Sequence, residues 1–191
     1  MDSYLTIIIS AIFINNIVLS RFLGICPFLG VSKNTSTAVG MGGAVLFVMT
    51  VATITTFAIY HFLLVPFGVP YLQTVAYILV IAFLVQVVEI VLKKVSPELY
   101  KGLGVFLPLI TTNCAILGVA ILVIQQDYNL LESVVFSLAN AAGFTLAIVL
   151  FSSLREHLEM AELPPAMKGV PAALVVAGIL SMAFMGFIGI V

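Results

Sequence analysis

Six apolar stretches, each nearly free of charged residues, are long enough to cross a lipid bilayer. A transmembrane helix needs about 20 residues to span a hydrocarbon core roughly 30 Å thick. The stretches are apolar on every side and lack the alternation of a membrane β-barrel, so we expect helices, which satisfy their own backbone hydrogen bonds. The sequence therefore predicts an all-α integral membrane protein with six transmembrane helices. Their approximate limits are residues 4–20, 38–64, 71–92, 102–124, 133–154 and 170–191.

The composition argues against a soluble globular protein and against a separate soluble domain. Of the 191 residues, 63% are hydrophobic and 8% are charged, which leaves too little polar surface for a soluble globule. The first stretch begins "MDSYL" and lacks a basic segment, so we expect a retained helix and not a cleaved signal peptide. The longest polar connection, residues 155–169, is too short to form a nucleotide, flavin or NAD site. We expect one membrane domain, residues 1–191, that binds no flavin, NAD or nucleic acid.

The basic residues predict the orientation of the chain in the membrane. Cytoplasmic loops of membrane proteins carry an excess of Lys and Arg. All seven Lys and Arg residues follow the first, third or fifth apolar stretch: Arg21, Lys33, Lys93, Lys94, Lys101, Arg155 and Lys168. We therefore expect these three connections to face the cytoplasm and both termini to lie outside.

An internal repeat relates the two halves of the chain. The phrases "CPFLGV" at residues 26–31 and "CAILGV" at residues 114–119 lie 88 residues apart and share Cys-x-[Phe/Ile]-Leu-Gly-Val. A shift of 88 residues aligns the first apolar stretch with the fourth. Each half contains three helices, so the second half enters the membrane from the face opposite to the first. We expect two inverted three-helix repeats, at about residues 4–92 and about residues 100–191.

Residues that interrupt helices surround both copies of the phrase. In inverted-repeat membrane proteins the working site tends to lie near the bilayer midplane, on helices that are discontinuous there. Proline removes a backbone donor and glycine relaxes the helix. We therefore expect the first and fourth helices to be discontinuous. The residues concerned are Asn15, Asn16, Gly24, Pro27 and Gly30 in the first copy, and Pro108, Thr111, Thr112, Asn113 and Gly118 in the second.

The repeated phrase contains the only two cysteines, Cys26 and Cys114. A lone cysteine in an apolar helix is most often a small buried hydrophobe, but the shared register and the neighbouring helix breakers favour a functional role. A disulfide between two buried thiols would have no route to exchange partners. A zinc site needs more ligands than the chain offers locally. An iron–sulfur cluster needs four thiolates as a rule, so that alternative requires a second protein that contributes two more.

Three segments resemble a known family of membrane subunits. They read "FINNIVLSRFLGICPFLGVSK", "GVFLPLITTNCAILGVA" and "LPPAMKGVPAALVVAGILSMAFMGFIGI". They look like the family of the A subunit of the Rnf complex, the ion-translocating ferredoxin:NAD oxidoreductase of bacterial membranes, and the similarity covers essentially the whole chain. The E subunit of the Na+-translocating NADH:quinone reductase (Nqr) is also similar, but there the proline after the first cysteine is typically replaced. Pro27 and "FLGVSK" favour Rnf.

The resemblance implies a shared redox cofactor. In that family the A subunit pairs with a homologous E subunit of opposite topology, and the two hold a [2Fe-2S] cluster with two cysteines from each; the matching positions here are Cys26 and Cys114. Other subunits (B, C, D and G) are implied to handle ferredoxin, flavin and NAD. The implied role is electron transfer across the bacterial inner membrane coupled to Na+ or H+ transport, with no complete active site in this chain alone.

Two alternatives and one acidic residue complete the sequence-based expectations. A stand-alone secondary transporter would also suit inverted repeats with broken helices, and it would need no iron. A scaffold subunit with inert thiols is the second alternative.

Glu89 is the one acid inside an apolar stretch, where carboxylates often serve transport. Because Lys93 stands four residues later, an ion pair within one helix is the favoured interpretation over an ion ligand.

Overall fold

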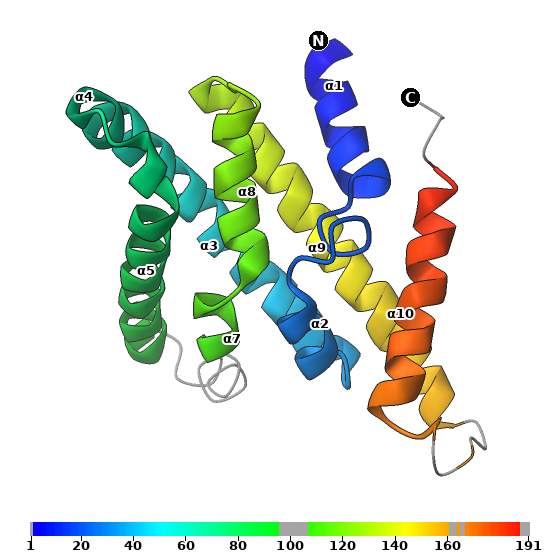
Figure 1. Ribbon diagram of the computed structural model, residues 1–191. Coiled ribbons are helices and arrows are strands. Elements are labelled where there is room, and N and C mark those ends of the chain that lie inside the picture. Colours follow the sequence, from blue (N-terminus) through cyan, green and yellow to red (C-terminus); the bar gives the residue numbers. More distant parts are fainter. Residues whose placement is uncertain (1, 96–106, 161–163, 165–166, 188–191) are drawn as a thin grey trace.

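The computed structural model describes residues 2–95, 107–160, 164 and 167–187, and every regular element in them is a helix (Figure 1). The all-α prediction is therefore confirmed for this part of the chain. In chain order the elements are α1 (Asp2–Ile9), a π-helix (Ser10–Ile14), α2 (Ile25–Val31), α3 (Thr35–Ile59), a π-helix (Tyr60–Leu64), α4 (Val65–Phe67), a 3-10 helix (Pro70–Leu72), α5 (Gln73–Val95), α7 (Leu107–Thr111), α8 (Cys114–Gln125), α9 (Leu130–Glu159) and α10 (Val170–Met185).

Four helical segments are long and apolar enough to cross a membrane. They are Thr35–Phe67, Gln73–Val91, Pro108–Gln125 and Leu130–Glu159, and they correspond to the second to fifth predicted spans. The first and sixth spans contain shorter apolar helices, Tyr4–Ile14 and Val170–Met185. Within the first predicted span the chain leaves the helix at Asn15, one of the residues expected to interrupt it, and residues 15–20 are not helical.

Helices α3 and α9 form the centre of the molecule and pack against each other along their lengths. Helix α8 also packs on α3, α5 packs beside α3 and α8, and α10 lies along α9 (Figure 1). Gly42 of α3 allows the close approach, because a Cβ atom there would overlap the side chain of Thr145 on α9. Phe28 of α2 stacks on Phe151 of α9 with ring centroids 4.2 Å apart.

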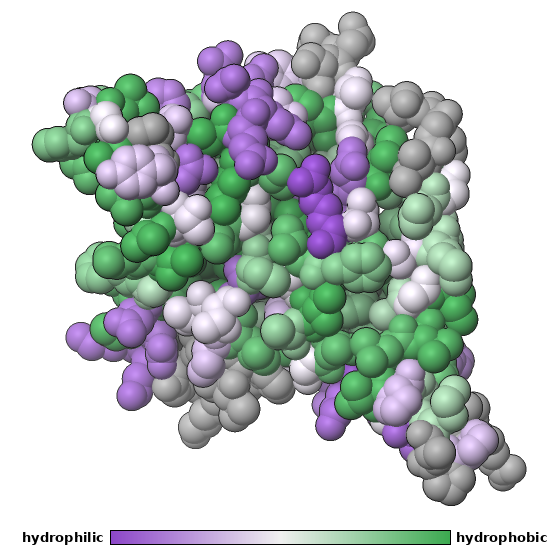
Figure 2. Space-filling view, in the orientation of Figure 1, coloured by the Kyte–Doolittle hydropathy of each residue, from purple (hydrophilic) through white to green (hydrophobic). Residues whose placement is uncertain are grey.

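The outer surface is apolar over most of its height. Figure 2 shows hydrophobic side chains across the body, and hydrophilic ones gather mainly toward its two ends. Large side chains such as Phe62, Phe67 and Phe83 are more than half exposed. A soluble monomer rarely exposes so much contiguous apolar surface, whereas a helix in contact with lipid does. This surface is consistent with a multi-pass membrane protein.

The first and fourth predicted spans are both interrupted. Residues 15–24 form an irregular segment between the first π-helix and α2, and Thr112 and Asn113 separate α7 from α8. Both interruptions lie where the repeated phrase predicted them. Helices α2 and α8, which carry the two copies of the phrase, run in opposite directions from these breaks (Figure 1).

Candidate functional site: the meeting of two helix breaks

Asn16 holds the first break in place. Its side chain is fully buried, and its amide nitrogen donates to the carbonyl oxygens of Ile12, at 3.0 Å, and Gly143, at 2.9 Å. Its carbonyl oxygen accepts from the backbone N–H groups of Val18, at 3.1 Å, and Leu19, at 3.4 Å. A backbone that leaves the helix needs such substitutes for its lost hydrogen bonds. One amide therefore closes the π-helix, starts the irregular segment and anchors both to α9.

Gly24 ends the irregular segment in the left-handed region, with φ 82° and ψ 25°. Glycine adopts this conformation without the steric penalty of a Cβ atom. The space around it is also closed, since an added Cβ would lie 3.0 Å from Phe144 and 3.2 Å from both Ala115 and Asn113. The first break therefore fits against the second one, at the start of α8, only because residue 24 has no side chain.

Asn113 forms the second break. It stands before the first residue of α8, and its carbonyl oxygen accepts from the backbone N–H of Ala115 at 3.0 Å, which caps the helix. The same side chain has a buried amide nitrogen with no acceptor among the described residues. Nearby, the Thr112 hydroxyl donates to the Pro108 carbonyl at 2.9 Å.

The two breaks meet at a thiol. The backbone N–H of Gly24 donates to Sγ of Cys114 at 2.9 Å, across 90 residues of sequence. Cys114 is the first residue of α8, and Cys26 is the second residue of α2, two positions after Gly24. The Cys114 thiol therefore contacts the backbone two residues before Cys26, and each cysteine is at the start of a helix.

Both thiols are free and exposed on the surface of this chain. This exposure argues against the interpretation of a cysteine as a small buried hydrophobe, and it leaves the sulfur atoms accessible to a second molecule. Among the residues that the structure describes, no group of three or more His, Cys, Asp or Glu side chains could hold a metal ion. Any metal centre at this position must therefore obtain further ligands from outside the described part of the chain.

Most of the helix breakers singled out from the sequence pack around these breaks. Asn15 closes the first π-helix, since its backbone N–H donates to the Ser10 carbonyl at 2.7 Å. Gly118 gives room to Leu23, whose Cδ1 would lie 2.6 Å from a Cβ atom at that position. Pro27 is buried inside α2, while Gly30 is exposed on the same helix.

Arg21 differs from its sequence-based expectation. It lines a cavity of about 200 Å³ together with Thr6 of α1, Asn140 of α9 and Gln126 and Tyr128, which follow α8. Helix α1 begins and α8 ends at the same end of the molecule, where α10 also ends (Figure 1). The Arg21 side chain therefore points toward the end of the molecule that carries the termini, and away from the end where the cytoplasmic connections are expected.

The other described basic residues agree with the expected distribution. Lys33, Lys93, Lys94, Arg155 and Lys168 lie on the connections or helix ends opposite the two termini (Figure 1). Lys101 lies outside the described residues. The bias of basic residues toward one end therefore persists without Arg21.

Glu89 lies half-buried on α5, away from the thiols in the sequence and on another helix. Its pairing with Lys93 stays a prediction. The wall of α9 behind the first break includes Gly143, which the sequence predicts as a close-packing residue, and Phe144, which the sequence analysis missed. The small residues of "LANAAG" were the available signal, because close backbone approach requires them.

Comparison with known proteins gives a consistent result. Residues 4–191 match the family described as "Rnf-Nqr subunit, membrane protein". The chain is 56% identical over 191 residues to the A subunit of the ion-translocating oxidoreductase complex of Syntrophotalea carbinolica, covering 100% of this chain and 99% of that protein. It is 58% identical over 183 residues to the A subunit of the Na(+)-translocating ferredoxin:NAD(+) oxidoreductase complex of Acetobacterium woodii, covering 96% and 95% of the two chains. The A subunit of the ion-translocating oxidoreductase complex of Aeromonas salmonicida is 50% identical over 191 residues, covering 100% of this chain and 99% of that protein.

Proposed function

Because the chain belongs to the Rnf-Nqr family of membrane subunits, we propose that it is a membrane subunit of an ion-translocating ferredoxin:NAD+ oxidoreductase. Its relatives carry the names of ion-translocating oxidoreductase subunits, one of them Na+-translocating with ferredoxin and NAD+. In this proposal the chain takes part in electron transfer across the bacterial inner membrane, coupled to transport of Na+ or H+. Ferredoxin, flavin and NAD bind to other subunits, corresponding to Rnf B, C, D and G.

The observation that carries the proposal is the contact of the Cys114 thiol with the first helix break, two residues before Cys26, with both cysteines exposed. Cys26 and Cys114 would supply two of the four ligands of a [2Fe-2S] cluster, and a homologous protein of opposite topology, the E subunit of Rnf, would supply the other two. Thiolate is the ligand that iron–sulfur chemistry requires, and the described part of the chain offers only this pair of thiols. The donor set therefore fits half of such a cluster.

The groups beside the thiols also suit this role. Hydrogen bonds to the sulfur ligands are one determinant of the reduction potential of iron–sulfur sites, and the N–H of Gly24 already donates to Sγ of Cys114. When bound, the cluster would supply one-electron transfer at membrane depth. The chain itself fixes the thiol positions through the Asn16 and Asn113 side chains, and the exposed face around them is left for the partner subunit.

The proposed topology is six transmembrane helices in two inverted repeats. The opposite directions of α2 and α8, which carry the repeated phrase, support this relation between the halves (Figure 1). In this topology the first and fourth transmembrane helices are the two broken ones, and both termini lie outside. At the opposed broken helices of the two paired proteins, a change of charge could stabilise one of two packing arrangements. This change of packing would couple electron transfer to ion movement.

The test uses the assembled complex with three variants of this subunit, Cys26→Ser, Cys114→Ser and the double change. Each should abolish the EPR signal of the reduced binuclear cluster and ferredoxin-dependent NAD+ reduction to a similar degree, because the two thiols act as one unit. Iron and acid-labile sulfide should fall from about two each per pair of subunits. NADH oxidation by an artificial acceptor at the soluble subunits should survive. Thr112→Ser is the matched control, since it keeps its hydroxyl donor beside Cys114 and should retain the signal.

Three results would contradict the proposal. An unchanged EPR signal and ferredoxin-to-NAD+ rate in Cys114→Ser would mean that the thiols only pack. Ion transport by an iron-free complex would favour a stand-alone secondary transporter. Quinone reduction by NADH without ferredoxin would assign the chain to the Nqr type of complex.

A further inference from the structure

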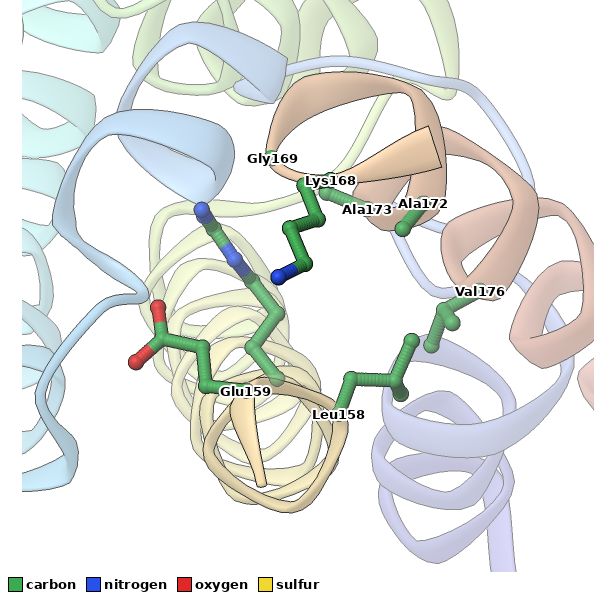
Figure 3. Close-up of a pocket in the computed structure, with 8 residues that line it drawn as sticks. Leu158, Glu159, Lys168, Gly169, Ala172, Ala173 and Val176 are labelled. Carbon is green, nitrogen blue, oxygen red and sulfur yellow. The ribbon is translucent and has the colours of Figure 1, made fainter. Parts of the chain in front are cut away.

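A cavity of about 280 Å³ lies between the end of α9 and the beginning of α10 (Figure 3). It is at the end of the molecule opposite the two termini (Figure 1). Arg155 and Leu158 line it from α9, and Lys168, Ala172 and Val176 line it from α10 and the residues just before it. The cavity is therefore separate in the fold from the thiols and from the Arg21 cavity.

Within the described part of the chain, two cations face this cavity without a carboxylate partner. Arg155 is held in place, since its Nη1 donates to the Leu29 carbonyl and to the Ser32 hydroxyl, both at 2.8 Å. The Lys168 side chain is exposed and has no hydrogen-bond or ion-pair partner among the described residues. Figure 3 shows its amine directed into the cavity from the side of α10.

The acidic residues that the structure describes near the cavity form no ion pair with these cations. Glu159 also lines the cavity, but within the described part of the chain it forms no ion pair with Arg155 or Lys168. Glu156 accepts a hydrogen bond from the Thr35 hydroxyl at 2.9 Å, which directs it toward α3. Two cations near one another remain unfavourable unless an anion lies between them, so the cavity is suited to an anionic group.

The rest of the cavity is apolar and continues onto a lipid-facing surface. Ala172 and Ala173 are buried in its wall. Beyond it, Val170 and Leu174 of α10 are more than half exposed, as expected for a helix in contact with acyl chains. An occupant should therefore combine an anionic head with apolar chains. Basic pockets between transmembrane helices bind the headgroups of anionic phospholipids such as cardiolipin.

We propose that this cavity binds an anionic phospholipid, with its phosphate between Lys168 and Arg155 and its acyl chains along α10. Gly169, just before α10, supports this placement because no described atom lies within 4 Å of an added Cβ there, so a headgroup can approach the first turn of the helix. The N–H groups of Val170 and Ala172, which have no acceptor within the helix, add a favourable dipole for the phosphate, although Pro171 between them has no N–H. The lipid would join α9, α10 and, through Arg155, α2.

The experiment measures lipid binding to the assembled complex by native mass spectrometry, with thermal unfolding as a second measurement. Lys168→Gln should weaken cardiolipin binding about fivefold, as expected for one lysine near a phosphate, and should reduce the stabilisation by cardiolipin. Lys94→Gln is the matched control, since Lys94 is exposed at the end of α5 and away from the cavity. This control and Lys168→Arg should both bind as the wild type does.

Phosphatidylcholine and inorganic phosphate are the comparison ligands. Neither should reproduce the effect of cardiolipin, because the first lacks net charge and the second lacks acyl chains. Equal stabilisation by inorganic phosphate would assign the site to a free anion and overturn the proposal. Equal loss of binding in Lys94→Gln and Lys168→Gln would overturn it too, since general attraction to a basic surface would then be sufficient. Unchanged cardiolipin binding in Lys168→Gln would also contradict it.

Discussion

Replacing Gly24 by alanine should separate the two helix breaks. The change places a Cβ atom at φ 82°, which costs about 1–2 kcal/mol for a residue other than glycine. The same atom would lie 3.0 Å from Phe144 and 3.2 Å from Ala115, which are parts of helices and cannot move away freely. Overpacking of this kind typically costs about 1–3 kcal/mol. We expect a total loss of about 2–5 kcal/mol in the free energy of unfolding.

The assay is a thermal melt of the complex, followed by fluorescence-detected size-exclusion chromatography. For a chain of this length the expected loss lowers the unfolding temperature by about 4–20 °C. The Gly24 N–H also donates to Sγ of Cys114. The variant should therefore shift the EPR spectrum of the reduced membranes, in addition to lowering stability.

Alanine replacements at two other glycines distinguish the backbone penalty from the overpacking penalty. Gly68 has φ 66° but open space around it, so Gly68→Ala should show only the backbone penalty of about 1–2 kcal/mol. Gly43 is helical and also has open space, so Gly43→Ala should be neutral or stabilise by about 0.5–1 kcal/mol. If Gly24→Ala melts no lower than Gly68→Ala, the close contact between the two breaks does not exist as described. If it melts like the wild type, the left-handed conformation is wrong as well.

Three further predictions follow from the described contacts. Asn16→Ala should lower stability by about 2–4 kcal/mol in the same melt, because it leaves buried backbone groups without partners, whereas Asn15→Ala removes one exposed side-chain bond and should cost under about 1 kcal/mol. A phosphatase fused to the C-terminus should be active and a fluorescent protein inserted near Glu159 should fluoresce; the reverse pattern would refute the orientation. Burial, and secondarily Glu132, raise the pKa of Tyr128, so its neutral form is favoured by folding. The stability that follows from this raised pKa is fully present below about pH 10 and is lost as the pH rises through the raised pKa. Tyr128→Phe should remove this loss of stability at alkaline pH. An equal loss in both proteins would contradict the prediction.

The positions of the breaks could be predicted from the sequence, but their construction could not. Asparagine and glycine at residues 16, 24 and 113 mark the breaks because they can replace helical hydrogen bonds or adopt a left-handed backbone. Pro27, which the sequence analysis counted as a breaker, lies instead within the first turn of α2. Proline is tolerated there, since the first N–H groups of a helix have no intrahelical acceptor.

The length of the first break was not predictable from hydropathy. Ile17, Val18 and Leu19 are at most 2% exposed although they lie in an irregular segment. An apolar residue buried in a loop and one buried in a helix contribute equally to a hydropathy average, so the expected span extended through residue 20. The π-helices at Ser10–Ile14 and Tyr60–Leu64 were missed for a related reason, because no residue type marks them by itself.

For Arg21, the position in the sequence and the surroundings in the structure give different information about the orientation of the chain in the membrane. The positive-inside rule counts a residue by its connection in the sequence, and Arg21 is an exposed residue of the irregular segment that forms the first break. Its long side chain extends toward the end that carries the termini, into a cavity with Thr6, Asn140 and Gln126. No described carboxylate pairs with it, and a charged side chain at this depth is favourable only where it reaches water or polar groups. Arg21 therefore adds no argument for a cytoplasmic first connection, and that inference depends on Lys33, near the start of α3.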